Sequence, residues 1–310
     1  MFLTKKTDFL MLTLICLLVF SCGCEEKSKP GSAISKSKAE KAQSLAFKFN
    51  DTAVDVYKVT VESSKCVEFE GETSEKSSFK GGKTGNNTEM VFSSEVVSVD
   101  EQGNAVEKIT IDSVKYAAIV KENPVVDFDS SREKDKVSPL FGLVGKSYTI
   151  KVASNGKMVG VVDANEVREA VKGGSSTHKA AQSLVSDEGM AQRHGGVVLP
   201  DDGKIASDTT WKRLESFDFG LMGTQSYEKV YKVESAKDAK DVAVTMKALP
   251  SSEMAEEIHK GQQTSDFSKM FDSTELYDGK LVFDSVAGKV KSYTEKLAAS
   301  WVAVDPSAGK

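Results

Sequence analysis

Valine is the residue that most constrains the fold of this chain. Residues 22–310 contain 34 valines and only 11 leucines. Beta-branched side chains pack well on a pleated sheet, whereas in a helix they lose rotamer freedom. Leu, Ile, Val and Phe together supply 75 of the 310 residues, which excludes a chain that is disordered throughout. The composition therefore predicts a folded body built mainly of strands.

Alternating polar and apolar residues place individual strands. One strand is expected around Tyr57–Val61. Two more are expected at about 88–99 and around Ile109–Ile111, joined by the glycine-containing turn Asp100–Asn104. A further strand should cover 242–248, with one apolar face.

The most specific local prediction is a hairpin at Asn-Gly, residues 155–156. Asn-Gly suits a two-residue type I′ turn, because both central residues can adopt positive φ. This turn would pair Val152 with Val159. It would also pair Ile150 with Val161, and all four side chains would then share one buried face.

Helices are expected only in the middle of the chain. A Ser-Pro pair opens 138–144, and proline after an N-cap serine predicts one or two helical turns there. Asp163 and Glu166 have capping-box spacing, which predicts a helix that ends at the glycines 173–174. A further helix is possible over 176–193, although its apolar stripe is weak.

These patterns predict an α+β fold dominated by antiparallel sheet, with curved or half-barrel-like sheets. Two strand-rich halves, 44–174 and 208–305, would be separated by a helical and loop connector at 175–207. Each half is large enough for a small core, so one joint core and two separate cores are both open.

The N-terminus has the pattern of a secretion signal. Lys5 and Lys6 precede a 12-residue apolar run, Phe9–Phe20. As a helix this run would rise about 18 Å, too little for a hydrocarbon core of about 30 Å. The following Val-Phe-Ser-Cys resembles the bacterial lipobox, in which the cysteine is lipidated and becomes the first mature residue. Residues 1–21 are therefore expected to be a lipoprotein signal peptide.

The lipobox resemblance implies that Cys22 carries acyl chains, such as palmitate, which anchor the protein in a membrane. Cys24 is a second, poorer candidate, and an ordinary secretory signal cleaved nearby is the alternative. Gly23 is not the aspartate associated with inner-membrane retention, which favours the outer membrane facing the periplasm. Residues 22–43 are rich in Lys, Glu and Ser and predict a flexible tether. A helix over about 35–45 is the alternative there.

Several classes of function have little support. The 41 basic and 46 acidic side chains give a net charge of −5, which argues against nucleic-acid binding. Gly-Gly-Lys-Thr-Gly at 81–85 resembles the end of a P-loop but lacks the upstream glycine and the flanking strand and helix, so a mobile loop is expected. His178, His194 and His259 have no zinc-site spacing and are expected to be solvated. No GxSxG elbow occurs.

Acidic residues and cysteines also favour structural roles. The acidic groups at 127–133 and 201–203 could bind Ca²⁺, but aspartate is common in turns and caps because its side chain bonds nearby backbone N–H groups. Cys66 is expected to be a free thiol in a strand, with a disulfide to Cys24 as the alternative. We therefore expect no catalytic residues, no metal and no cofactor.

Aromatic residues concentrate around one expected hairpin at 211–231. Trp211, Phe219, Tyr227 and Tyr231 are candidates for lining a concave apolar surface that binds a ligand such as a lipid. The alternative is an ordinary core, because a large strand must bury one face.

Short motifs along nearly the whole chain resemble an uncharacterised family of bacterial lipoproteins and secreted proteins, classified only as a domain of unknown function. They are VDFDS at 126–130, LVGK at 143–146 with the following YTIKVASNGKMVGV, a Leu-Pro segment before Trp211, and YDGKLVFD at 277–284 before AGK. Ser207-Asp208 stands where the family usually has Gly-Asp. The resemblance implies an architecture and an envelope location, and no chemistry. By fold analogy the sheets resemble the half-barrels of lipoprotein carriers.

The sequence thus predicts a membrane-anchored bacterial envelope lipoprotein that is not an enzyme. Its body would be a scaffold or adaptor that presents strand edges and loops to an envelope protein partner. The alternative is a periplasmic binding or carrier protein for an apolar ligand such as a lipid.

Overall fold

The computed structural model describes residues 9–19, 43–49, 53–68, 81–200, 203–205, 209–219, 223–235, 240–252 and 272–302. For residues 9–19 it describes the backbone alone. The strands, 3₁₀-helices (η) and α-helices are, in chain order, β1 (Phe9–Val19), β2 (Gln43–Ser44), β3 (Asp55–Glu68), β4 (Gly82–Val99), β5 (Ala105–Val120), β6 (Asn123–Asp129), η1 (Glu133–Asp135), η2 (Pro139–Leu143), β7 (Ser147–Val152), β8 (Met158–Asp163), α1 (Asn165–Ala170), α2 (Ser176–Leu184), α3 (Asp187–His194), β9 (Lys204–Ile205), β10 (Thr210–Asp218), β11 (Thr224–Ser235), β12 (Asp241–Ser251), β13 (Asp272–Asp284) and β14 (Lys289–Val302).

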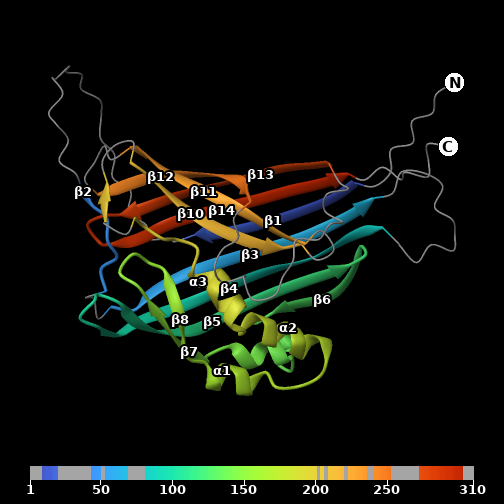
Figure 1. Cartoon of the computed structure of the whole chain (residues 1–310). Helices are drawn as coiled ribbons and strands as arrows, with labels where there is room; N and C mark the ends of the chain where they lie inside the picture. Colours follow the sequence, from blue (N-terminus) through green and yellow to red (C-terminus); the bar gives the residue numbers. More distant parts are fainter. Residues whose placement is uncertain are drawn as a thin grey trace, which may run out of the picture.

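One large antiparallel sheet dominates the structure (Figure 1). Its twelve strands follow the order β10-β11-β12-β13-β14-β1-β3-β4-β5-β7-β8, with β6 paired to β5, and β2 and β9 form a second, two-stranded sheet. Strands from before the helices lie on one side of β1, and strands from after them lie on the other. The expected α+β fold, mainly antiparallel and in two strand-rich halves around a helical segment, is confirmed.

Strand β1 is the apolar segment expected to be the core of the secretion signal. It pairs over its whole length with Ser292–Val302 of β14 on one side and with Lys58–Glu68 of β3 on the other. Both neighbours run antiparallel to β1, so β3 and β14 run parallel to each other. If a signal peptidase removed β1, these two strands would border the place it leaves.

The strands expected from alternation are present. β3, β4, β5 and β12 cover the four segments, and Val59, Ile109, Ile111, Val242 and Val244 on their inner face are at most 2% exposed. The expected turn joins β4 to β5. Its Asp100 Oδ1 accepts hydrogen bonds from the backbone N–H groups of Gln102 (3.0 Å) and Asn104 (2.9 Å).

The hairpin of β7 and β8 is present, but its register is only half as expected. Ile150 faces Val161, as predicted. The expected pairing of Val152 with Val159 is wrong, because Val152 faces Met158 and the register shifts next to it. The buried side of β7 is nevertheless the expected one, since Ile150 and Val152 are 1% and 7% exposed.

The offset at Val152 arises in the turn, and the shift between Lys151 and Val152 restores the expected register. Gly156 alone among residues 153–157 has a positive φ, 89°, whereas a type I′ turn needs positive φ at both central residues. Gly156 N donates to Ala153 O (2.8 Å), which makes the two residues between them the centre of the turn. Gly156 is then the additional residue of a bulge, and it moves the pairing by one position.

The helical turns expected at 138–144 are present, and so is the helical segment expected at 176–193, with one difference. Ser138 caps η2, since its Oγ accepts from Leu140 N (3.3 Å). The segment 176–193 forms two helices rather than one. Ser186 is the N-cap of the second helix, since its Oγ accepts from Gly189 N (3.0 Å). The first helix ends two residues before it, at Leu184.

The capping box expected at the start of α1 is wrong. The N-cap position is Ala164, and the Asp163 side chain accepts from Asn165 N (2.9 Å). Glu166 turns away from the helix and accepts from Lys146 Nζ (3.1 Å). An ion pair with the start of β7 therefore replaces the reciprocal cap.

A single continuous core runs through both halves, which resolves the choice between one core and two. In the first half, η2 packs against β5, α1 against β7 and α3 against β8, and in Figure 1 α1–α3 lie against this half alone. Phe92, Ile109, Leu143, Val167 and Met190 come from both layers and are all fully buried.

Residues 43–49 cross the end of the sheet and contact both halves. Phe47 N donates to Ser154 O in the β7–β8 turn (3.4 Å). Lys48 N donates to Gly288 O in the β13–β14 turn (3.1 Å). The segment therefore connects a hairpin of each half: β7–β8 at one end of the strand order and β13–β14 next to β1 in its middle. Its first two residues form β2, so the described end of the possible helix at 35–45 is extended; residues 35–42 lie outside the described residues.

We expect Leu45→Ala to destabilise the fold, because Leu45 is 1% exposed and anchors this crossing segment. A buried Leu→Ala change costs about 2–5 kcal/mol. Urea denaturation of residues 25–310 measures the free energy of unfolding. The exposed neighbour Ala46 provides the control, since Ala46→Ser should change the free energy by less than about 0.5 kcal/mol. Equal effects of the two changes would show that the segment does not hold the halves together.

Candidate functional site

The four aromatic residues predicted to line a ligand site lie in the core. Their exposed fractions are 9%, 8%, 0% and 3% for Trp211, Phe219, Tyr227 and Tyr231. Trp211 and Tyr231 stack with ring centroids 5.1 Å apart, and Trp211 Nε1 donates to Val198 O (3.0 Å). The structure thus brings Trp211 and Tyr231 together as packing partners, whereas Phe219 and Tyr227 each pack against Phe217.

The second half of the sheet curls so strongly that its own side chains fill the space inside the curve. β10 and β14 are four steps apart in the strand order, which is about 19 Å along a flat sheet. Phe219, directly after β10, nevertheless lies edge-on against Trp301 of β14, with ring centroids 4.9 Å apart. The inner faces of the first and last strands of this half therefore meet.

A buried ionic group, the Lys229 cluster, lies inside this curl. It consists of Lys229 on β11, Glu215 on β10, Glu295 on β14 and Tyr277 on β13. The Lys229 side chain is 4% exposed and forms ion pairs with Glu215 and with Glu295, the latter at 2.7 Å. Its Nζ also lies 5.1 Å from the centre of the Tyr277 ring, a cation–π distance.

The cluster holds two carboxylates against one cation. Burial raises the pKa of Glu295 to about 7, against the opposing effect of Lys229. Burial also disfavours the charge on Lys229, but Glu215 and Glu295 outweigh it and raise the pKa of Lys229 above its usual range. The group can therefore take up or release one proton near neutral pH. Lys229 itself is too enclosed to act as a nucleophile on a substrate.

The first half contains a second polar contact, which is partly buried and centred on His194. Tyr57 Oη lies 3.0 Å from His194 Nδ1, and Tyr148 Oη lies 2.5 Å from Nε2. The ring also packs edge-on against Phe92, with centroids 5.1 Å apart. The expectation of a solvated histidine is wrong here, because the last residue of α3 points onto the sheet.

His194 is neutral in this position. Burial, and then the neighbouring Arg193, lower the pKa of His194 to about 3. A neutral imidazole has one N–H donor and one acceptor, so one tyrosine donates to the ring and the other accepts from it. The contact joins α3 to β3 and β7. Its role is to hold the helix on the sheet.

The other histidines and the acidic groups have local roles. His178 Nδ1 lies 2.7 Å from Ser175 Oγ at the start of α2, and His259 lies outside the described residues. Asp127 pairs with Arg132 at 2.9 Å. Asp129 Oδ1 accepts from the backbone N–H of the residue two positions on, as expected for a turn. Of the acidic turn 201–203, only Gly203 is described.

The glycine-rich segment and the cysteines complete the comparison with the sequence. Residues 82–85 are the first residues of β4, so the expectation of a mobile loop is wrong for them. Cys66 is a free, partly buried thiol of β3, as expected. Cys22 and Cys24 lie outside the described residues, and the lipidation site and the disulfide alternative stay predictions.

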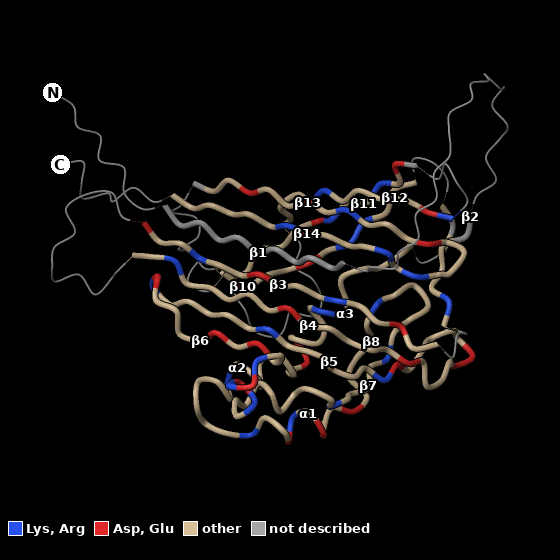
Figure 2. The backbone as a smooth tube through the Cα atoms, turned by 180° about the vertical axis from the view of Figure 1, so that it is seen from behind, with Lys and Arg blue, Asp and Glu red and all other residues tan. Residues whose placement is uncertain are grey.

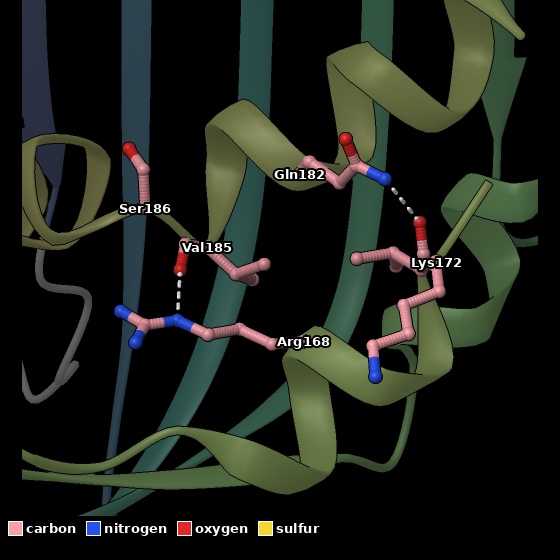
Figure 3. Close-up of a pocket in the computed structure, with 6 residues that line it drawn as sticks. Arg168, Lys172, Gln182, Val185 and Ser186 are labelled. Carbon is pink, nitrogen blue, oxygen red and sulfur yellow. Dashed lines mark hydrogen bonds between the residues drawn. The ribbon is translucent and has the colours of Figure 1, made fainter. Parts of the chain in front are cut away.

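A small pocket between α1 and α2 gave no signal in the sequence (Figure 3). Its volume is about 290 Å³, and it is lined by Arg168, Val171, Lys172, Gln182, Val185 and Ser186. Arg168 donates from Nε to Val185 O (3.1 Å) and pairs with Asp187 at 2.6 Å. Lys172 pairs with Glu169 at 2.5 Å. Both cations of the pocket are therefore already occupied by partners within the protein.

The part of the chain that the structure describes contains no group of three or more His, Cys, Asp or Glu that could hold a metal ion. None of the helices in these ranges is long and apolar enough to cross a membrane.

No protein-family model matches the chain, and no curated protein matches it. The resemblance to an uncharacterised lipoprotein family therefore stays a prediction.

We expect the Lys229 cluster to make stability depend on pH. The folded pKa of Glu295, about 7, exceeds the ordinary value of 4.5, so the folded protein binds a proton that the unfolded chain releases. This contribution is complete below about pH 4.5 and is lost as the pH rises through about 7. Glutamine cannot ionise. The stability advantage of wild type over Glu295→Gln should therefore shrink between about pH 5 and pH 8, measured by urea denaturation.

A matched control is Glu228→Gln, on the same strand as Lys229 but paired with Lys212 outside the cluster. Its difference from wild type should change much less over the same range. If the Glu295→Gln and Glu228→Gln curves ran parallel, the carboxyl of Glu295 would not be the group that titrates.

Proposed function

We propose that this protein is a lipid-anchored bacterial envelope protein whose folded body is a non-catalytic scaffold or adaptor. Support for the anchor is the lipobox-like sequence ending at Cys22, after the apolar run. Residues 22–42 then separate the anchor from the crossing segment at 43–49. Fully extended, these residues reach about 70 Å, so the body can act at a distance from the membrane surface.

One observation supports the scaffold role most: the inner face of the sheet is occupied, and its outer face is the open surface. Helices cover the inner face in the first half, and the curl fills it in the second. On the outer face, Lys58 and Lys115 flank Glu89 in a row of ion pairs at 3.3 and 3.1 Å. Figure 2 shows basic and acidic residues interspersed along the strands, and such a mixture of charges suits a protein partner better than a polyanion.

The outer face also carries exposed apolar side chains. Leu249 on β12 and Leu276 on β13 are 64% and 61% exposed. Apolar contacts within a polar surface are what a non-obligate protein interface uses. These two positions are therefore the most informative places to look for a partner.

The carrier alternative has one specific observation in its favour. The buried Tyr227 hydroxyl and one carboxylate oxygen of Glu275 form no hydrogen bond of good geometry. Burial, then the charge of Glu275 and a hydrogen-bonding contact with it, raise the pKa of Tyr227, so the two groups lie next to each other. A ligand with a hydroxyl or amide could satisfy both in the aromatic wall around them.

We expect Cys22→Ala to abolish fatty-acid labelling and to leave an unprocessed precursor in the envelope fraction. The reason is that the lipobox cysteine is both the acyl acceptor and the first mature residue. Labelling with a clickable palmitate analogue, followed by intact mass, measures both effects. The control Cys24→Ala should label and be processed as wild type. Continued labelling of Cys22→Ala would move the anchor to another residue.

We expect a photoreactive amino acid at Leu249 or Leu276 to crosslink in living cells to one defined envelope protein. The control position is Val137, which is 92% exposed but lies between η1 and η2 in the first half. It should give no such adduct. Mass spectrometry identifies the adduct, and the same adduct from Val137 would mean non-specific contact.

Lipid extraction separates the two functions. The scaffold role expects organic extracts of the purified protein to contain no stoichiometric apolar ligand. A co-purifying lipid, lost on Tyr227→Phe in a protein that still folds, would favour the carrier alternative instead.

A further inference from the structure

Removal of residues 1–21 would take β1 out of the middle of the sheet. β3 and β14 each pair with β1 over eleven residues, so the backbone N–H and C=O groups on both borders would lose their partners. We propose that β3 and β14 then pair directly with each other, in parallel, so that the processed protein has a continuous eleven-stranded sheet without a gap. This inference rests on the proposed function, because it requires that the signal is cleaved.

The two borders are level with each other along their whole length. Val19 lies between Lys58 and Ser292, and at the other end of β1 Phe9 lies between Glu68 and Val302, a constant offset of 234 positions. One contact at this offset already bridges the borders. Just beyond the end of β1, Lys289 Nζ lies 2.7 Å from an Asp55 carboxylate oxygen. A sideways movement of one strand spacing would close the gap without a slip in register.

The side chains that would become neighbours suit each other. At the same offset, Glu62 stands level with Lys296, and Ile15 of β1 lies between them. Both alternate with buried positions of their strands and so lie on the outer face, where direct pairing would bring opposite charges together. On the inner face Val59 and Tyr293, each 1% exposed, would pack together.

The sequence of β1 does not fit the place it occupies. Its neighbours alternate, with polar residues on the outer face, as Thr60 and Thr294 do at the level of Leu17. β1 reads FLMLTLICLLV, which is apolar at every position except Thr13. A continuous apolar run is typical of a strand buried on both faces, whereas this sheet has one open face. Direct pairing of β3 with β14 would place two strands side by side that both alternate between polar and apolar residues.

A disulfide can distinguish the two arrangements. Strands separated by β1 lie about 9.6 Å apart, and directly paired strands about 4.8 Å. Disulfides need Cα atoms roughly 4.4–6.8 Å apart. Cys66 of β3 and Ser300 of β14 are level, with Met11 between them, and both alternate with the inward-facing positions. The change Ser300→Cys therefore provides a partner for a cysteine that the protein already has.

The experiment uses the full chain with Ser300→Cys and Cys24→Ser, expressed in a bacterium that processes lipoproteins. Envelope protein is treated with a mild oxidant, and the link to Cys66 is quantified by peptide mass spectrometry. We expect about tenfold more intramolecular disulfide than with Ala298→Cys, which lies on the same face but about 8 Å from Cys66 after closure.

The possible failures are separable. Absence of the disulfide from processed, folded protein whose thiols still react with maleimide would overturn direct pairing, and would mean that the gap stays open or takes up another strand. An equal yield from Ala298→Cys would also overturn it, since the register would then be undefined. A purified protein whose mass still includes residues 1–21 would instead contradict the proposed function.

Discussion

Backbone pairing along one seam holds the two halves of this protein in a single sheet. β14 comes from the end of the chain and β3 from its beginning, and both pair with the short apolar strand between them. The crossing segment at 43–49 and the ion pair of Asp55 with Lys289 reinforce the seam at one end. Everything else, including the continuous core, depends on the halves staying side by side, because neither the helices nor the curl crosses this line.

The two halves bury the inner face of the sheet in different ways. The first covers its inner face with helices, and a neutral histidine between two tyrosines fixes α3 in place. The second curls until Phe219 meets Trp301, and it encloses a lysine and two carboxylates. Burying that ion group costs desolvation energy, which good geometry and several partners offset. In both halves the inner face serves the fold, so interactions with other molecules are left to the outer face and the edges of the sheet.

Sequence reasoning reached the fold class because valine content and alternation are local properties of strands. It failed where distant residues decide the outcome. His194 was expected in solvent, since nothing near it in the chain announces Tyr57, 137 residues away. The Asn-Gly hairpin has the expected location, but the pairing next to the turn is shifted by one residue because the turn contains one more residue than a two-residue loop. The Lys229 cluster had a usable signal: Lys229 alternates with Tyr227 and Tyr231, so it had to face the same side as two large aromatic rings.

If residues 1–21 are a signal peptide, as proposed, the pairing of β1 with β14 also constrains when the protein can be exported. The two strands are joined across nearly the whole chain, so they meet only after synthesis is complete, and such distant pairings form slowly. Once they have met, the leader is enclosed by hydrogen bonds on both sides and is hidden from any receptor that must bind it as an extended or helical peptide. Recognition of the leader must therefore be faster than folding. A precursor that folds first would stay in the compartment where it was made.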